Sequence, residues 1–415
     1  MDKQKYIIAG GGCSGLSVAL QLAQNLNCPT EIVIIDQEKK LDNDRTWCFW
    51  SSAPPCPSHL LHHTWKTMSF ADQHGVVAQS IAPYAYYMVR SSKWYNYMWT
   101  QLEQYEQVSF MEATIHQIDE DEQGPYVRTN QGVIRGNYVL NSVQPATTQE
   151  SHWPTYQLWQ HFTGWWVEAE QDVFDPKDAR LMDFRVEQKG ESRFMYVLPY
   201  SPRKALVEFT VFSKKLLSPE EYDQEIASYL DKYYPQTSFT VAEKESGKIP
   251  MSNRKFNRYQ HPHVLNIGTV GGAVKPTTGY AFLRIQNEAK QIAQKLQQGR
   301  RVTNVLSTSA ARFPFYDSLL LHILTHWGEQ GAGIFSALFR ANPMRRILTF
   351  LNEKSTIWQE ARIFTRLPYG PFLRALAIQL RYRGMRSLSA LLKKWSATPG
   401  TPIDADHQIA QQELR

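Results

Sequence analysis

The chain has 415 residues, of which 42% are hydrophobic and 20% charged, and its formal net charge is +6. Such a length can fill two or three packed units, or one domain with an insertion. A mean hydropathy of −0.45 and the lack of any apolar run of about 18 residues exclude a polytopic membrane protein. Because a strand pattern begins within a few residues of the N-terminus, we expect no secretory signal and a cytoplasmic protein.

The cysteines and the charge limit the partners that we expect. Cys13, Cys28, Cys48 and Cys56 have neither CxxC spacing nor nearby histidine pairs. We therefore expect free thiols and no metal site. The mild excess of positive charge is compatible with an anionic membrane surface or with good solubility, and we expect no nucleic-acid partner.

The first residues, YIIAGGGCSGLSVALQLAQ, predict a strand, a tight glycine turn and an amphipathic helix. Gly10, Gly12 and Gly15 have G-x-G-x-x-G spacing: the first permits the turn, the second lets the backbone approach a pyrophosphate, and the third lets the helix lie close to the strand. A second strand, EIVIID, ends at Asp36, about 20 residues further on, where a carboxylate can bind a ribose. The pattern predicts a dinucleotide site, and its place at the start of the chain favours FAD over NAD.

An aromatic stretch, DRTWCFW, follows the second strand. Trp47, Phe49 and Trp50 have two interpretations: they line a ligand cavity, or they pack in the core. In a cavity, each ring face would attract a cation by roughly 0.5–2 kcal/mol. Arg45 and Arg90 are candidates for contacts with a flavin or its phosphates.

The next part of the chain predicts short strands and one helix. We expect strands at 66–70, 76–80, 108–118 and 126–143, and a helix at 92–106. These elements continue the nucleotide-binding unit.

From 159 to 212 the pattern has period two and is rich in aromatic residues, which predicts an antiparallel sheet. A helix at 219–234 follows, then the strand HVLNIG with a second glycine-rich loop, GTVGGAVKPTTGYAF. This order implies that distant segments close the nucleotide-binding domain around an inserted sheet. We therefore expect a nucleotide-binding domain formed by 1–60, 61–150 (with a small insertion) and 246–303, an antiparallel sheet domain at 151–245, a helical part at 304–395 and a flexible tail at 396–415.

Together and in this order, GGGCSG, DRTWCFW, LMDFR, ALVEFTVFS and GTVGGAVKPTTGYAF resemble the lycopene β-cyclases of carotenoid-making bacteria. The resemblance runs over nearly the whole chain, and its specific parts are KPTTGYAF and ALVEFT. It implies an α/β fold: an FAD-binding Rossmann-like domain of the hydroxylase and reductase type, an inserted antiparallel β-sheet substrate domain and a helical C-terminal part. The chain departs from the pattern twice. Phe209 takes the place of a second acid beside Glu208, and Thr269 follows Gly268 where the hydroxylases usually have Asp.

The resemblance implies an isomerase that closes the ends of lycopene into β-ionone rings, giving γ-carotene and then β-carotene, with no net redox change. It also implies reduced FAD as the cofactor, NAD(P)H as a transient reductant, and other enzymes of the carotenoid pathway as partners. Two alternatives remain: an FAD- and NAD(P)H-dependent oxidoreductase, such as a prenyl-lipid reductase or monooxygenase, and a non-catalytic carotenoid-binding flavoprotein.

Glu208 is the proton donor that the resemblance implies. The strand period places Leu206, Glu208 and Thr210 on one face, where desolvation would raise the pKa of Glu208 and keep it protonated; the alternative is a glutamate that faces solvent. Asp183 either assists in catalysis or pairs with Arg185. The resemblance also assigns Tyr280 to the substrate, with Trp47, Phe49 and Trp50, and it assigns Gly268, Gly271, Gly272, Thr278 and Gly279 to the cofactor.

Lycopene dissolves in bilayers, so such an enzyme must reach a membrane. The segment 371–395 predicts a helix with one apolar stripe and a basic flank that contains no acid, as in interfacial helices. We therefore expect peripheral association with the inner face of the cell membrane; the alternative is a packed terminal helix with a solvated basic face. The stripe consists of Leu373, Leu376, Leu380, Leu388, Leu391 and Trp395, and the flank of Arg374, Arg381, Arg383, Arg386, Lys393 and Lys394.

Overall fold

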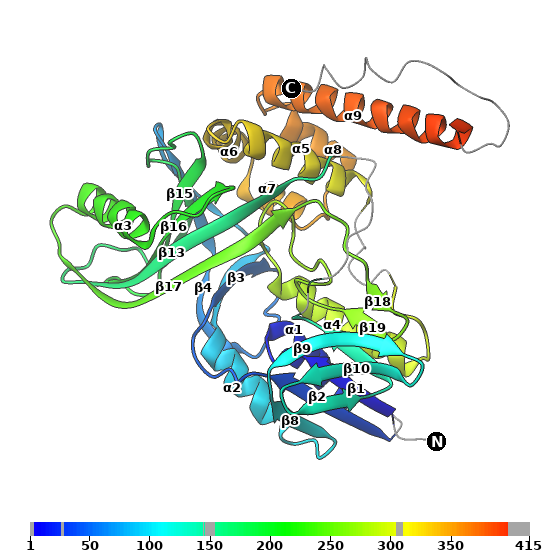
Figure 1. Cartoon of the computed structure of the whole chain (residues 1–415). Coiled ribbons are helices and arrows are strands. Elements are labelled where there is room, and N and C mark those ends of the chain that lie inside the picture. Colours follow the sequence, from blue (N-terminus) through cyan, green and yellow to red (C-terminus); the bar gives the residue numbers. More distant parts are fainter. Residues whose placement is uncertain (1–3, 26–28, 144, 146–153, 304–309, 397–415) are drawn as a thin grey trace.

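The computed structural model describes residues 4–25, 29–143, 145, 154–303 and 310–396, with side chains up to 384 (Figure 1). The N-terminal sheet and its helices form one end of the molecule, and the C-terminal helices form the other. Long antiparallel strands extend between these two ends and to one side of them.

The N-terminal sheet is mostly parallel and has six strands, in the order β18-β19-β12-β1-β2-β8. The first glycine turn follows its strand β1. The helices α1 (Cys13–Asn25) and α4 (Phe282–Gln297) pack together on one face of this sheet. A small sheet of three strands covers the other face through Ile118 and Val127. The strands of the larger sheet are β1 (Gln4–Ala9), β2 (Thr30–Asp36), β8 (Val108–Glu112), β12 (Tyr138–Asn141), β18 (Tyr259–His261) and β19 (Val264–Asn266), and those of the small sheet are β9 (Ile115–Asp121), β10 (Gly124–Thr129) and β11 (Gly132–Arg135).

The prediction of two long strands, at 108–118 and 126–143, is wrong in length, because five short strands occupy this part of the chain. Gly124 and Gly132 have φ angles of 103° and 127°, values that side chains rarely tolerate, and they form the turns that divide it. The helix expected at 92–106 is α2 (Ser91–Leu102).

The second large sheet has seven strands, in the order β17-β13-β16-β15-β14-β5-β6. All its pairs are antiparallel except β14 with β5. The strands β5 and β6 come from the part of the chain that was expected in the nucleotide-binding domain, and β17 runs across the expected boundary at 245. The strands are β5 (Thr67–Asp72), β6 (Gly75–Ser80), β13 (Gln157–Ala169), β14 (Asp178–Asp183), β15 (Ser192–Pro199), β16 (Lys204–Ser213) and β17 (Phe239–Ser252).

The two faces of this sheet have different partners. The helix α3 (Pro219–Tyr233), which begins with a capping box between Ser218 and Glu221, packs on the face of Val207, Phe209 and Val211. The opposite face packs against the C-terminal helices and a three-stranded sheet in the order β3-β7-β4. These elements are β3 (Thr46–Ser51), β4 (Leu61–Trp65), β7 (Ala85–Arg90), α5 (Arg312–His326), α6 (Gln330–Ala341), α7 (Met344–Leu351), α8 (Ile357–Phe364) and α9 (Tyr369–Ser396).

The C-terminal part is helical, as expected. Within the described residues, every helix is too short or too polar to cross a membrane. The expected tail at 396–415 lies outside the described residues, except for its first position.

Candidate active site

A cavity of about 440 Å³ lies between the seven-stranded sheet, β3 and the second glycine-rich loop. Glu208 of β16, Glu245 of β17 and Tyr196 of β15 line it from the sheet, and Thr278 and Tyr280 line it from the loop. The expected acid and the loop expected to bind the cofactor therefore face the same space.

Four neighbouring strands place Glu245, Gly164, Glu208 and Tyr196 in one cross-strand row. Directly paired residues of antiparallel strands have their side chains on the same face. Gly164 lies between the two glutamates, and a Cβ there would be 3.4 Å from both the Glu208 Cβ and the Glu245 Cγ. The two glutamates thus flank a position that has no side chain, although they lie far apart in the sequence.

The environment of Glu208 favours its neutral form. Burial first, and then the nearby charge of Glu245, raise the pKa of the Glu208 carboxyl to about 8. The Thr210 hydroxyl donates a 2.7 Å hydrogen bond to Glu208 Oε1 and opposes this shift without cancelling it. A carboxyl with such a pKa keeps its proton at neutral pH and can act as a general acid.

Glu245 was not expected from the sequence. Its side chain is buried and accepts hydrogen bonds from Thr46 Oγ1 at 2.6 Å and from Trp166 Nε1 at 3.2 Å. Burial raises the pKa of Glu245, and both hydrogen bonds oppose that shift. Only the pairing of β17 with β13 brings this residue to the cavity, so no local sequence motif indicates it.

The first glycine turn has the geometry of a phosphate-binding turn. A Cβ on Gly15 would lie 1.9 Å from the carbonyl oxygen of Gly10, whereas a Cβ on Gly12 would meet nothing within 4 Å. The space beside Gly12 adjoins the N-terminus of α1, where backbone N–H groups attract anions. Asp36 closes the turn by accepting a 2.7 Å hydrogen bond from the Gly11 amide.

The second glycine-rich loop lies against the first. A Cβ on Gly268 would be 2.6 Å from Ser14 Cβ, and one on Gly279 would be 2.6 Å from Gln160 Oε1, so both positions need glycine. Gly271 and Gly272 belong to the same loop. Among the described residues, Thr278 Oγ1, Gln160 Oε1 and Ser14 Oγ are buried without a hydrogen-bond partner. Unsatisfied polar atoms around an open space fit a polar ligand.

A family model described as "Lycopene cyclase protein" matches residues 6–377, most of the chain. The chain belongs to the lycopene cyclase family. Over 231 residues it is 26% identical to the lycopene beta-cyclase of Pantoea ananas, in an alignment that covers 54% of this chain and 52% of that protein. The chain spans about half the length of the curated relatives that it matches.

Solved structures with a similar fold extend the comparison beyond the lycopene cyclase family. Klebsiella pneumoniae HpxO, solved with FAD and uric acid, has a TM-score of 0.59 at 16% identity, with 85% of this chain and 96% of that chain covered. A geranylgeranyl bacteriochlorophyll reductase-like protein from Thermoplasma acidophilum has a TM-score of 0.55 at 11% identity, with 94% and 100% covered. At these identities the likeness shows the fold alone. It confirms the expected fold class, in which a sheet is inserted into a Rossmann-like domain and helices follow.

In this lycopene cyclase family member the aromatic stretch forms β3, and its three rings have different surroundings. Trp47 lines the large cavity and packs edge-on against Trp94, with ring centroids 5.6 Å apart. Phe49 stacks on Phe282 at 4.8 Å inside the core, which supports the packing interpretation for this residue. Trp50 meets Tyr280 edge-on at 4.5 Å.

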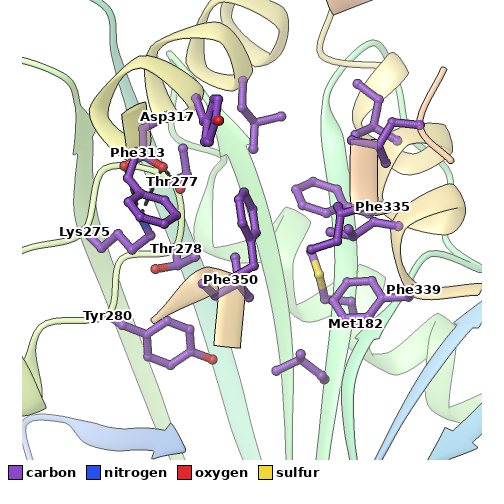
Figure 2. A pocket seen from close by; sticks show the side chains of 18 of the residues that line it. Met182, Lys275, Thr277, Thr278, Tyr280, Phe313, Asp317, Phe335, Phe339 and Phe350 are labelled. Carbon is purple, nitrogen blue, oxygen red and sulfur yellow. Dashed lines mark hydrogen bonds and ion pairs between the residues drawn. The ribbon is translucent and has the colours of Figure 1, made fainter. Parts of the chain in front are cut away.

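A second, apolar cavity of about 110 Å³ lies beside the first and shares Tyr196, Thr278 and Tyr280 with it. Figure 2 shows Thr278 and Tyr280 on one side of this cavity and Met182, with Phe335 and Phe339, on the other. Trp50 also lines it. The shared tyrosines thus lie where the acid site meets an apolar space.

A buried cluster of ion pairs lines one side of the apolar cavity (Figure 2). Lys275 Nζ lies 3.0 Å from Asp317 Oδ2 and 2.8 Å from Glu353 Oε1, and Thr277 Oγ1 donates a 2.7 Å hydrogen bond to Asp317. These contacts join the second glycine-rich loop to α5 and to the turn that follows α7.

The two arginines expected at the cofactor lie apart. Arg45 lines the rim of the large cavity with an exposed side chain, 3.4 Å from Asp44. Arg90 forms an ion pair with Glu243, and its guanidinium carbon lies 4.5 Å from the centre of the Trp166 ring. Arg90 does not line the cavity, and its charge is already paired.

Asp183 was expected either to assist in catalysis or to pair with Arg185, and the structure places it away from Glu208. Its carboxylate lies 2.6 Å from Arg185 Nη2 and accepts a 2.6 Å hydrogen bond from Tyr229 of α3, on the opposite face of the sheet. Burial alone would raise its pKa, but the hydrogen bonds from Arg185 and Tyr229 outweigh burial and hold the pKa below its usual range. The ion-pair interpretation of Asp183 fits this geometry.

Proposed function

We propose that this lycopene cyclase family member closes the open ends of lycopene into β-ionone rings, with Glu208 as the proton donor. The observation that carries the proposal is the place of Glu208 in a cavity that adjoins an apolar space, where burial raises the pKa of its carboxyl to about 8. Membership of the family supports a carotenoid substrate.

In the proposed reaction, the Glu208 carboxyl gives its proton to a terminal carbon–carbon double bond. The electron pair of a neighbouring double bond attacks the resulting cation and forms the ring bond, and the ring then loses a proton to a base. Substrate and product are isomers, so no electrons are gained or lost. The rings of Tyr196 and Tyr280 lie beside both cavities, and each ring face stabilises a nearby cation by about 0.5–2 kcal/mol.

The residues around the glycine turns fit FAD. The open space at Gly12 beside α1 would take the pyrophosphate, and Asp36 would accept a hydrogen bond from a ribose. The unpaired Thr278 Oγ1 and Gln160 Oε1 would meet the polar edge of the flavin. Bound here in its reduced form, FAD would supply negative charge that stabilises a cation. In this proposal NAD(P)H acts only as a transient reductant.

A reaction in heavy water tests the proposed chemistry. Because the proton that Glu208 donates exchanges with solvent, each new ring should contain a deuterium, and the product should otherwise have the mass of lycopene. The reductant consumed should not scale with the rings formed. Mass spectrometry of the product and an assay of the reductant in the same reaction give both quantities.

Three outcomes of this reaction would count against cyclisation. A product heavier than lycopene by two hydrogens in ordinary water, or cofactor oxidised in proportion to product, would identify a reductase or monooxygenase. A protein that binds the carotenoid and leaves it unchanged would be a carrier.

We further propose that α8 and the start of α9 dock on an anionic membrane. Large apolar side chains are exposed here: Ile357 is 67% exposed, Trp358 81% and Leu373 61%. The same segment lines the apolar cavity from inside with Ile363, Phe364, Leu367 and Phe372. Its exposed charged side chains are all basic: Lys354, Arg362, Arg366, Arg374, Arg381 and Arg383.

This surface differs in part from the stripe expected from the sequence. Leu373 and Leu380 are exposed, whereas Leu376 packs against α5 beside the buried Ala375. The side chains of Arg386, Leu388, Leu391, Lys393, Lys394 and Trp395 lie outside the described residues. The contacts of Ala375 and Leu376 show that one face of α9 is packed while another is exposed.

Replacing Arg362, Arg374 and Arg381 with glutamate should weaken binding to anionic vesicles by roughly a hundredfold or more, since each basic residue near such a surface contributes about 1 kcal/mol. Co-sedimentation with phosphatidylserine vesicles measures the change. The matched control reverses three exposed basic residues elsewhere in the chain, Arg128, Lys177 and Arg300, and should bind as the unmodified protein does. Equal loss in both variants would show a general charge effect and would end the docking proposal.

A further inference from the structure

The site contains a second carboxyl whose role the proposed reaction leaves open. Glu245 lies beside Glu208 across Gly164, on the same face of the sheet. Strands are spaced about 4.8 Å apart, so two residues on either side of a central strand have backbones nearly 10 Å apart. A side chain between them would keep the two carboxyl groups separate. At Gly164 a Cβ would lie 2.9 Å from Leu206 Cδ1 and 3.4 Å from both Glu208 Cβ and Glu245 Cγ, so any side chain larger than that of glycine would crowd both glutamates.

The hydrogen-bond partners of the two glutamates differ in kind. Trp166 Nε1 can only donate a hydrogen bond, and with Thr46 Oγ1 it gives Glu245 two donors. Such partners favour a carboxylate. Thr210 faces Glu208 with a hydroxyl, which can donate to a carboxylate or accept from a protonated carboxyl. If the pair holds a single negative charge, these partners place that charge on Glu245.

The residue next to Glu208 cannot supply this second charge. Successive residues of a strand point to opposite faces, and Phe209 is fully buried in the cluster under α3. A carboxylate at that position would face the apolar core and not the cavity. Positions 206 and 210 share the face of Glu208 but carry leucine and threonine, so the second carboxylate comes from a neighbouring strand.

The other titratable groups near the two glutamates are neutral, paired or screened by solvent. Glu245 is therefore the neighbour whose charge raises the pKa of Glu208. Burial raises the pKa values of Cys48, Tyr86, Tyr196 and Tyr280, so these groups stay neutral near pH 8. Glu243 is paired with Arg90. The remaining charged residues that line the cavity lie exposed at its rim, where solvent screens them: Asp44, Arg45 and Lys248.

We propose that Glu245 is a positioning residue for the acid: its negative charge, held by Thr46 and Trp166 across Gly164, keeps Glu208 protonated and ready to donate. This role rests on the proposed function of Glu208, yet it makes a separate claim about how two carboxyls share one charge. It places the second acid of the site on another strand.

Glu245→Gln tests the claim by removing the charge while keeping the size of the side chain. Glu208 is active when protonated, so activity is present below its pKa and lost as the pH rises through it, near pH 8 in the unmodified protein. Without the neighbouring charge the pKa of Glu208 falls, and this alkaline limit should move down by about one pH unit. At pH 8 the rate should then fall several-fold, whereas at pH 6 it should stay close to that of the unmodified protein.

Three further variants separate this role from a structural one. Glu245→Asp keeps the charge and should restore the alkaline limit. Thr46→Val removes one donor to Glu245 and should move the limit in the same direction as Glu245→Gln, by less. Glu168→Gln makes the same chemical change in β13 at an exposed residue paired with Lys204, and should leave the limit unchanged. An unchanged limit in both Glu245→Gln and Thr46→Val would overturn the proposal.

Infrared spectroscopy of the flavin-loaded protein without carotenoid gives an answer that does not depend on turnover. The carbonyl stretch of a protonated carboxyl that disappears in Glu208→Gln reports on Glu208. This band should vanish at lower pH in Glu245→Gln than in the unmodified protein. A band that titrates at the same pH in both would overturn the role of Glu245 even if rings form. A shifted band in a protein that forms no rings would support this role and reject only the proposed cyclisation.

Discussion

Glu208→Gln should reduce ring formation by about 10²–10⁴-fold, the usual contribution of a general acid, because an amide cannot donate the proton. The substitution preserves the shape of the side chain, so the protein should fold and bind FAD. Pigment analysis of lycopene incubated with the purified, reduced protein measures the loss. Turnover within a factor of a few of the unmodified protein would remove Glu208 from the mechanism.

The same variant has a signature in stability that requires no substrate. A free glutamate ionises near pH 4.5, while Glu208 in the folded protein keeps its proton to about pH 8. Between these values the unfolded chain has lost a proton that the folded chain retains, so this residue makes the folded state less stable as the pH rises. Chemical unfolding across this window should show a decline that is smaller in Glu208→Gln. An identical decline in both proteins would mean that Glu208 ionises normally.

Gly12→Val should abolish FAD binding while the protein still folds. A Cβ at this position meets no atom of the protein within 4 Å, so the side chain fits the folded chain but occupies the space next to α1 where the pyrophosphate would lie. Flavin absorbance of the purified variant measures binding, and its thermal unfolding without added FAD measures the fold.

Gly15→Ala is the contrasting variant. Its Cβ would lie 1.9 Å from the carbonyl oxygen of Gly10, so the helix and the strand would have to move apart, and this protein should be unstable with or without FAD. A Gly12→Val protein that retains full flavin would place the dinucleotide elsewhere.

Much of the fold could be predicted from the sequence because its signals are local. The spacing of Gly10, Gly12 and Gly15 specifies a turn within one strand and one helix, and the period of two in β13 to β16 indicates which residues share a face. The pattern thus placed Glu208 opposite to Phe209 correctly. The lengths of the strands after 108 were harder to predict, because turns at Gly124 and Gly132 divide a stretch in which apolar and polar residues are mixed.

The candidate site could be predicted only where a motif contains its residues. Glu245 lies in EKESGK, a polar stretch of β17 that looks like an exposed strand, and its burial depends on pairing with β13. Asp183 is the opposite case. It lies in LMDFR, which resembles a functional motif, but its carboxylate accepts hydrogen bonds from Tyr229 and Arg185. Both outcomes depend on which strands become neighbours, and that information is not local.

The position of β17 at the edge of the seven-stranded sheet has a consequence for dynamics. Edge strands have hydrogen-bonded neighbours on one side only, and such segments open at a lower free energy than the centre of a sheet. Each opening would carry Glu245 away from Gly164 and admit water to Glu208, which would then ionise more easily. The population of the competent acid is therefore linked to the closure of one strand, and amide hydrogen exchange at Glu245 and Ser246 would report how often that strand opens.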